Sequence, residues 1–237
     1  MSLREAGKIR RRTRILDAAR ACLREEGAAG LSTKAIARRA EVSVATLYNL
    51  FGSKEEIVAA LMSSTIDGLR ERFAPDSDAI ASDEEQPANA LAQGAIDEFD
   101  ADAFFYRELI RSIEQFESRT TLDRVVELGV DLGEPFIARL IERGDLMDLV
   151  SARVLAHQIF MSFVHALRMW ASELTDTAQF RVQVDHAMAL TLAGVANDPF
   201  RQRLHERLTA LDAPMEAFSR AVHPETGPAE FPRAQPA

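Results

Sequence analysis

Apolar residues recur at intervals of three and four along almost the whole chain, and no segment shows sustained alternation of apolar and polar residues. Intervals of three and four place apolar side chains on one face of an α-helix, whereas alternation is typical of a strand. We therefore predict an all-α fold of about nine or ten helices. The pattern places them at residues 9–26, 33–40, 44–51, 54–74, 88–101, 103–118, 121–143, 151–174, 177–196 and 199–211.

Two short helices with a turn between them follow the first long helix. Gly27 is placed to end the first helix, and Ser32 or Thr33 is placed to cap the next one. A turn at residues 41–43 separates the two short helices. This spacing predicts a helix-turn-helix at residues 33–51.

Local residues also predict how longer helices begin and bend. Ser53 as N-cap and Glu56 three residues later form the pattern of a reciprocal capping box, in which each side chain binds the other residue's backbone. Pro135, preceded by Gly129 and Gly133, predicts a kink or a break in the helix that contains it.

The chain divides into two domains at an acidic segment bounded by prolines. Residues 75–87, PDSDAIASDEEQP, predict an exposed connector. It joins a three-helix helix-turn-helix domain, residues 1–74, to a larger C-terminal helical bundle, residues 75–237. Four prolines in the last fifteen residues predict a flexible tail, which we place from about residue 212.

Charge is distributed unevenly between the two domains. Residues 1–54 contain 12 Lys or Arg and 5 Asp or Glu, a net charge of +7, whereas the whole chain has a net charge of −9. Phosphate contacts need Lys and Arg, so this asymmetry favours a protein that touches a polyanion with its N-terminal domain only. A solvated basic helix without a partner would account for the charge equally well.

The composition of the chain bears on its cellular location and on the role of its cysteine. No apolar run approaches the roughly 20 residues of a membrane helix, and the basic N-terminus lacks the continuous apolar stretch of a secretory signal. We therefore expect a cytoplasmic protein. Cys22 is the single cysteine and lies in an apolar row at helical spacing, so we expect an inert core thiol rather than a redox or nucleophilic one.

The second short helix, residues 44–51, has one apolar face and one bare, uncharged face. Leu47, Leu50 and Phe51 share the face expected to pack inward. The opposite face, with Val44, Ala45, Tyr48 and Asn49, is narrow enough to enter a major groove about 12 Å wide. A plain three-helix corner packed against the body would explain the inward residues but not the bare outer face.

Each exposed residue of this helix suits a particular DNA contact. Asn49 could bond an adenine edge, Val44 or Ala45 could touch a thymine methyl group, and the Tyr48 and Thr46 hydroxyls could reach phosphates. The helix N-termini at Thr33 and Ser53 could each bind a phosphate, with Lys54 adding charge at the second. The predicted DNA-binding residues are Thr33, Lys34, Arg38, Ser43, Val44, Ala45, Thr46, Tyr48, Asn49 and Lys54.

Residues 12–61, RTRILDAARACLREEGAAGLSTKAIARRAEVSVATLYNLFGSKEEIVAAL, resemble the DNA-binding domain of the tetracycline-repressor-like (TetR) family of bacterial transcription regulators. The resemblance implies phosphate contacts by Thr33, Tyr48 and Lys54, and places Ser43, Val44, Ala45, Thr46 and Asn49 near base edges. Two positions depart from the family pattern: Glu41 lies in the turn where a glycine is frequent, and Leu50 where the family often has His or Tyr.

Residues 143–196 resemble the last two long helices of that family, which pair with their copies in a four-helix dimer interface. The resemblance implies a homodimer whose two recognition helices face a pseudo-palindromic operator, about 34 to 36 Å apart or a multiple of it. Without the family, such stripes indicate intramolecular core more often than interface. The predicted interface stripes are Ala156, Phe160, Phe163, Leu167 and Trp170, with Val184, Met188, Leu192 and Val195.

Aromatic and apolar residues gather in the helices where family members enclose their effectors. They suit an apolar ligand pocket, and they suit a solid core equally. The candidate pocket residues are Phe99, Phe104, Phe105, Tyr106, Leu109, Ile113, Phe116, Phe136, Met161 and His165.

Other chemistries find little support. His157, His165 and His186 lack the spacing of a metal site, so we expect no metal and no cofactor. No phosphate loop or nucleophile elbow indicates an enzyme. We expect a nucleoid-associated homodimeric repressor, released from double-stranded DNA by a small-molecule effector. The alternatives are an effector-independent regulator or activator and, more remotely, an all-helical enzyme.

Overall fold

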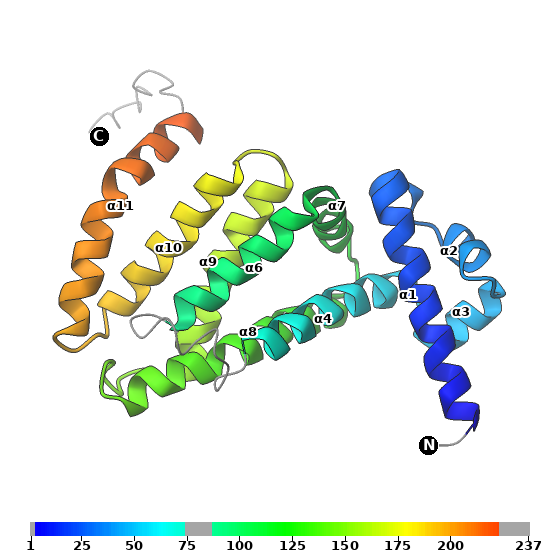
Figure 1. The fold of residues 1–237 in the computed structure, drawn as a ribbon, viewed down its shortest axis with the longest axis horizontal. Coiled ribbons are helices and arrows are strands. Elements are labelled where there is room, and N and C mark those ends of the chain that lie inside the picture. Colours follow the sequence, from blue (N-terminus) through cyan, green and yellow to red (C-terminus); the bar gives the residue numbers. More distant parts are fainter. Residues whose placement is uncertain (1–2, 74–86, 223–237) are drawn as a thin grey trace, which may run out of the picture.

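The computed structural model describes residues 3–73 and 87–222 (Figure 1). This part of the chain contains ten α-helices and no strand, which confirms the all-α prediction. None of its helices is long and apolar enough to cross a bilayer. The helices are α1 (Leu3–Gly30), α2 (Thr33–Arg39), α3 (Val44–Phe51), α4 (Lys54–Arg72), α6 (Pro87–Ala101), α7 (Ala103–Glu114), α8 (Arg119–Glu142), α9 (Ala152–Ala171), α10 (Thr177–Ala193) and α11 (Phe200–Val222).

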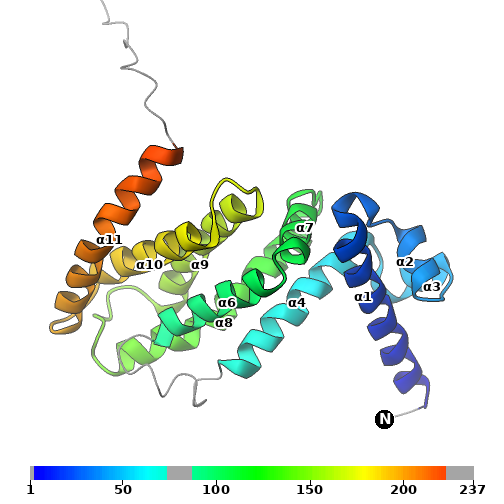
Figure 2. The same ribbon diagram turned by 45° about the horizontal axis from the view of Figure 1, so that its top comes forward.

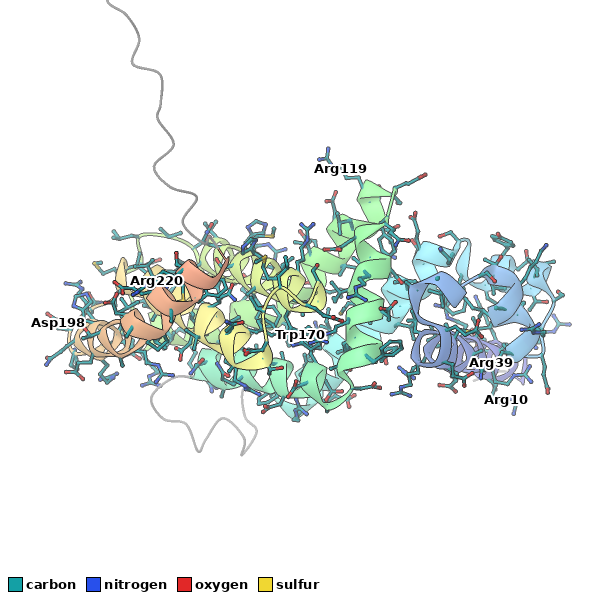
Figure 3. All side chains as sticks on the ribbon, turned by 90° about the horizontal axis from the view of Figure 1, so that it is seen from above. Arg10, Arg39, Arg119, Trp170, Asp198 and Arg220 are labelled. Carbon is teal, nitrogen blue, oxygen red and sulfur yellow. The ribbon has the colours of Figure 1, made fainter. Side chains whose placement is uncertain are left out.

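Helices α1, α2 and α3 lie at one end of the molecule and α11 at the opposite end (Figures 1 and 2). Figure 3 shows the same separation, with Arg10 and Arg39 at the first end and Asp198 and Arg220 at the other. Helix α4 leaves the first end and packs against α6, α7 and α8. It is therefore the helix that continues from the N-terminal domain into the body.

Helix α1 starts earlier than predicted and changes conformation where predicted. It begins at Leu3 rather than near Ile9, so the basic residues that precede Ile9 are already helical. Gly27 has φ 67° and ψ −167°, a conformation that favours glycine, and one more helical turn follows it. The predicted end of the first helix at Gly27 is therefore a break inside α1.

Serine side chains cap the next three helices. The Ser32, Ser43 and Ser53 hydroxyls each accept a hydrogen bond from the backbone N–H three residues later, at 3.0 to 3.1 Å. The reciprocal half of the capping box predicted at Glu56 is wrong, because its carboxylate binds α8 instead. Each short helix thus has a defined N-terminus.

One apolar core joins α1, α2, α3 and α4. Ile15, Leu23, Ile36, Leu47 and Ile57 are completely buried within it. Cys22 is 1% exposed in the same cluster, which confirms the prediction of a core thiol. Side chains from all four helices thus pack in one core, and this packing fixes the orientation of α3.

The body differs from prediction at the end of α7 and in the middle of α8. Helix α7 ends at Glu114 rather than near residue 118. Helix α8 continues through Pro135, and Gly129 is a packing position: a Cβ there would lie 2.1 Å from Cζ of Phe160. Close approach of α9, rather than a break, therefore accounts for that glycine.

The tail predicted from about residue 212 is wrong for the first eleven residues. Helix α11 runs to Val222 with Pro214 inside it, and Leu204 and Leu211, which precede the proline, pack it against the body. Residues 223–237, and residues 74–86 with almost all of the predicted connector, lie outside the described residues.

Two turns at the α11 end of the body are joined by backbone hydrogen bonds. The N–H of Met147 donates to the carbonyl of Val195, and the N–H of Asn197 donates to the carbonyl of Asp145, both at 2.8 Å. Between them, Leu146 and Ala196 form an isolated antiparallel bridge and are buried. This backbone clasp ties the α8–α9 turn to the α10–α11 turn.

Candidate nucleic-acid interface and adjoining cavity

Helix α3 is held at both ends. Its N-terminus is capped by Ser43, as described above. At its C-terminus, the Arg12 guanidinium donates a 2.5 Å hydrogen bond to the carbonyl of Leu50 and lies 4.1 Å from the ring centroid of Phe51. Arg12 thus attaches the end of α3 to α1, a role that sequence reasoning missed because it depends on the packing of two separate helices.

The outward face of α3 is close to the predicted one. Ala45, Tyr48 and Asn49 are exposed, with Tyr48 47% exposed, while Leu47 and Phe51 are buried. Val44 is a correction: it is half-buried and packs against the core. The reason is helical spacing, since Val44 lies one and two turns before Leu47 and Phe51.

Two predicted hydroxyl contacts are already engaged in the free protein. Ser43 Oγ lies 2.8 Å from Thr46 Oγ1 and also accepts the Thr46 backbone N–H. Ser43 is exposed and Thr46 half-buried. A phosphate or base contact by either hydroxyl must share or replace this bond, whereas Tyr48 and Asn49 have no such competitor among the described residues.

Exposed cations surround α3. Thr33, the first residue of α2, is half-buried. Lys34, Arg38 and Lys54 are exposed, and the described part of the chain offers none of them an ion pair. Arg39 differs, because its guanidinium is paired with Glu25. Lys34, Arg38 and Lys54 therefore remain available to an external anion.

A second group of free cations lies on the first turns of α1. Lys8, Arg10, Arg11 and Arg14 are exposed, and none has an ion pair with a described residue. They were absent from the predicted site residues, which were drawn from the helix-turn-helix and the start of the next helix. The signal that could have found them is their density within seven residues.

The unusual Glu41 lies at the turn between α2 and α3. Its φ is 53°, in the left-handed region that favours glycine. The side chain is exposed. Glu41 thus accepts a strained backbone, costing about 1 kcal/mol relative to glycine, and puts one acid beside the otherwise basic surface.

The body contains an apolar cavity of about 370 Å³, partly open to solvent. Helices α4, α6, α7, α8 and α9 bound it, with Met188 of α10. Glu114 and Arg168 are the two charged residues among the described lining residues, and Arg168 Nε donates to Glu114 Oε1 at 2.7 Å. Five of the ten predicted pocket residues line it: Phe99, Ile113, Phe116, Phe136 and Met161.

The other five predicted pocket residues lie outside this cavity. Phe104 is 54% exposed and His165 is also exposed, because both point away from the bundle. Leu109 is buried in the core. Phe105 packs below Arg20 and Arg24 of α1, and Tyr106 donates its hydroxyl to Glu98 at 3.0 Å. These positions of α7 face α1 and α6 rather than the cavity.

Helix α4 contributes lining residues that sequence reasoning missed. Met62, Ile66 and Leu69 line the cavity from α4, which is separated from α3 by two residues. Their apolar spacing indicated only a buried stripe, since periodicity does not distinguish a filled core from a cavity wall. The cavity and α3 therefore share one helix.

The stripes predicted to form a dimer interface face the interior of the chain. Helices α8 and α11 cover the sides of α9 and α10 on which these stripes lie. Intramolecular packing, the alternative reading of these stripes, is therefore what the structure shows. Ala156, Leu167, Trp170, Val184, Met188 and Leu192 are buried, and Phe160, Phe163 and Val195 are half-buried and packed against the core.

Helix α7 is hydrogen-bonded to α1. The Glu108 carboxylate, 8% exposed as a residue, accepts the Ala28 backbone N–H at 2.6 Å and an Arg111 N–H at 2.5 Å. Arg24 Nε donates to Asp102 at 2.6 Å. Because α7 also lines the cavity, a shift of α7 would displace α1 through these hydrogen bonds.

Helix α8 is hydrogen-bonded to the first turn of α4. The Glu56 carboxylate accepts the Thr121 hydroxyl at 3.0 Å and an Arg124 N–H at 2.5 Å. Beside it, Glu55 accepts the backbone N–H of Glu117 at 3.1 Å. A second connection therefore joins the cavity wall to the segment that follows α3.

A metal site does not emerge from the described residues. No group of three or more His, Cys, Asp or Glu side chains in residues 3–73 and 87–222 is arranged to hold an ion. His157 and His165 are exposed on α9.

A capped recognition helix with a bare outer face, free cations around it and a helical body define a helix-turn-helix DNA-binding regulator. Residues 15–61 match the model of the bacterial regulatory proteins of the tetR family. No curated protein matches the sequence of the chain. Residues 15–61 therefore form a DNA-binding domain of the tetR type.

Solved structures share the fold over about four fifths of the chain or more. SmeT, the repressor of the Stenotrophomonas maltophilia multidrug efflux pump SmeDEF, is 22% identical, with a TM-score of 0.55 over 80% of this chain and 92% of SmeT. Thermus thermophilus FadR, a repressor in complex with lauroyl-CoA, is 20% identical, with a TM-score of 0.65 over 79% of this chain and 97% of FadR. TylP of Streptomyces fradiae is 20% identical, with a TM-score of 0.57 over 90% and 93%.

Proposed function

We propose that the protein is a homodimeric repressor that leaves a pseudo-palindromic operator when a small molecule occupies the cavity in the body. The observation that carries the proposal is that the cavity wall and the DNA-binding domain share α4 and are joined by two sets of hydrogen bonds. A ligand that moves α7 would push on α1 and α4 and change the spacing of the two recognition helices. It changes DNA occupancy only by its differential affinity for the two spacings.

The proposed DNA contacts follow the exposure of α3. Asn49 and Ala45, with Val44 at the edge of the face, approach base edges, and Tyr48 approaches a phosphate. Ser43 and Thr46 lie beside them and exchange their mutual hydrogen bond for one to DNA. Thr33, Lys34, Arg38 and Lys54 contact the phosphate backbone at the starts of α2 and α4 and along α2.

The free cations of α1 extend this surface. Lys8, Arg10, Arg11 and Arg14 add sequence-independent affinity that weakens as salt increases. The acidic remainder of the chain is repelled by DNA, so the charge distribution also orients the protein. We therefore expect the protein to reside on DNA in the nucleoid.

The dimer contact proposed is the outward side of α9 and α10, opposite the buried stripes. Val154 and Leu190 are each 57% exposed there, although large apolar residues are usually buried. Pairing this side with its copy would bury these residues and make a four-helix interface related by a two-fold axis. Size-exclusion chromatography with light scattering tests the dimer, which Leu190→Glu should weaken.

The relatives support a cavity that accepts apolar compounds. A SmeT structure contains triclosan, and the Thermus thermophilus FadR structure contains lauroyl-CoA. These ligands belong to those proteins, but triclosan and the lauroyl chain are apolar, as is the cavity wall here. An effector for this chain should likewise bury most of its surface in the body.

Selection of bound fragments from genomic DNA tests the proposal. We expect enrichment of a two-fold symmetric sequence, bound with a steep inverse dependence on salt concentration. A compound that fills the cavity should then lower operator affinity. An unchanged affinity with the cavity occupied would leave an effector-independent regulator or activator, and no enrichment of any sequence would overturn the DNA-binding assignment of α3.

A further inference from the structure

The cavity extends along α8. Its wall on α8 is a single stripe from Leu122 to Ile137, which spans about 22 Å at 1.5 Å per residue. An extended apolar chain can therefore lie along α8 in contact with this stripe.

The polar groups of the lining are confined to one place. Apart from Glu114 and Arg168, the described lining residues are Ala, Gly, Val, Leu, Ile, Met and Phe. A polar ligand atom inside the channel would lose its hydrogen bonds to water without replacement, which costs several kilocalories per mole. Any polar group of the ligand must therefore lie at the Glu114–Arg168 pair.

That pair lies at the open side of the channel. The Glu114 and Arg168 side chains are 30% and 62% exposed, and Leu122 and Met161, which also line the cavity, are each 40% exposed. These four residues come from α7, α8 and α9. A chain entering between them would leave its head group in contact with the pair and with water.

The existing ion pair selects the charge of the head group. Arg168 uses Nε to bind Glu114 Oε1, which leaves its other N–H groups as donors and Glu114 Oε2 as an acceptor. A hydroxyl, which both donates and accepts, can bond to both residues without separating them. A carboxylate at the free Arg168 N–H groups would lie beside the like-charged Glu114, and an ammonium group at Glu114 Oε2 would lie beside the like-charged Arg168, so each would be repelled.

We propose that the cavity binds a single-chain amphiphile with an uncharged hydroxyl head group, its chain along α8 and its hydroxyl between Glu114 and Arg168. This inference rests on the proposed role of the cavity as a ligand site. It separates this chain from the FadR relative that holds lauroyl-CoA, because the phosphates of coenzyme A need several cations. The one lining cation here is already paired.

Trp170 provides a reporter that does not involve DNA. It is the single tryptophan of the chain, completely buried, and its ring centroid lies 6.5 Å from that of Phe99, which lines the cavity. Filling the cavity should change its fluorescence. The probes are 1-dodecanol, dodecanoate and dodecylammonium, titrated into the full chain below the concentrations at which they aggregate.

We expect 1-dodecanol to bind about threefold to fivefold more tightly than either charged probe. From 1-octanol to 1-dodecanol, affinity should rise about fourfold per methylene group, as for burial of a chain in an apolar channel. Ala95→Phe, which fills the channel, should abolish binding while circular dichroism shows an intact fold. A preference for dodecanoate or dodecylammonium, or no dependence on chain length, would overturn the proposal.

Charge removal gives the sharper test. Glu114→Gln frees Arg168 and should transfer the preference to dodecanoate, and Arg168→Gln frees Glu114 and should transfer it to dodecylammonium. The matched controls are Glu216→Gln and Arg220→Gln, an exposed ion pair on α11 away from the cavity. Unchanged preferences in both Glu114 and Arg168 variants would refute the head-group assignment.

Operator binding, measured separately by fluorescence anisotropy of labelled DNA, distinguishes this inference from the proposed function. Binding of 1-dodecanol with unchanged operator affinity would support the ligand class and refute induction. Loss of operator affinity with a charged compound but not with 1-dodecanol would support induction and refute the ligand class.

Discussion

Glu56 of α4 and Thr121 of α8 are joined by a 3.0 Å hydrogen bond from the threonine hydroxyl to the carboxylate. Residue 56 was expected to close a capping box on its own helix, but its side chain instead connects the first turn of α4 to the cavity wall. Arg124 donates to the other carboxylate oxygen. A residue three positions from the N-cap thus links the two domains.

Glu56→Gln should weaken this link without removing it, because the amide oxygen can still accept from Thr121 while the charge attracting Arg124 is lost. The Glu56 and Arg124 side chains are 32% and 52% exposed, so solvent weakens their ion pair. We therefore expect the free energy of unfolding to fall by about 1 kcal/mol. Urea denaturation measures this change. Glu71→Gln, an exposed position on the same helix with no ion pair to a described residue, should leave stability unchanged.

Arg12 and Arg10 should respond differently to the same substitution. Arg12→Gln removes the hydrogen bond to the Leu50 carbonyl and the contact with Phe51, so we expect a loss of about 1 to 2 kcal/mol of stability. Arg10→Gln removes an exposed, unpaired cation and should leave stability unchanged. It should lower the slope of log affinity against log salt by about one. Equal effects of the two substitutions on stability would contradict the role given to Arg12.

Two residues of α3 should separate affinity from sequence preference. Tyr48→Ala should weaken binding to all sequences, because a phosphate contact carries no base information. Asn49→Ala should cost about 1 to 3 kcal/mol on the selected operator and relax the preference at one base pair. Anisotropy titrations with the operator and its single-base variants measure both. If neither substitution changed binding, the outward face of α3 would not be the DNA-reading surface.

Gly129 and Gly68 provide a matched test of helix packing. Gly129→Ala would place a methyl group 2.1 Å from the Phe160 ring, so we expect destabilisation of about 1 to 3 kcal/mol. Gly68→Ala points into open space on α4 and should stabilise by up to about 1 kcal/mol. Thermal unfolding gives both signs. A neutral Gly129→Ala would mean that α8 and α9 are packed less closely than described.

Burial raises the pKa of Tyr106 to about 12; the hydrogen bond with Thr65 opposes this rise and the hydrogen bond with Glu98 adds to it. The unfolded chain loses this proton near pH 10 while the folded chain keeps it. The stabilisation is therefore complete below about pH 10 and is lost as pH rises toward 12. Tyr106→Phe should lose less stability over that interval, as shown by urea midpoints at pH 8, 10 and 11; parallel losses would contradict the prediction.

The DNA-binding domain could be predicted closely because its signals are local. Ser43 and Gly52 bound α3 within a few residues, and the side that buries Leu47 follows from helical period alone. Val44 was misplaced because it lies at the border of that side. Where the capping residue, the turn and the helical spacing of apolar residues agree, the sequence is sufficient to predict a helix and its buried side.

The body could be predicted only as a set of helices. An apolar stripe such as that of Trp170 and Leu167 predicts that this face of the helix is buried. It does not tell whether helices of the same chain or of a second copy bury it. The role of Glu56 depended on Thr121, 65 positions away in the sequence. The continuation of α11 through Pro214 was missed because a proline usually ends a helix.

The backbone clasp between Met147 and Val195 makes the body mechanically unequal at its two ends. The turns at the α11 end are fastened to each other by main-chain bonds around two buried residues. The end nearer α1 is fastened by side chains such as Glu56 and Glu108, which can exchange partners. A ligand that separates the helices of the body should therefore move them further at the end near α1 than at the end near α11. The displacement would be largest beside the DNA-binding helices.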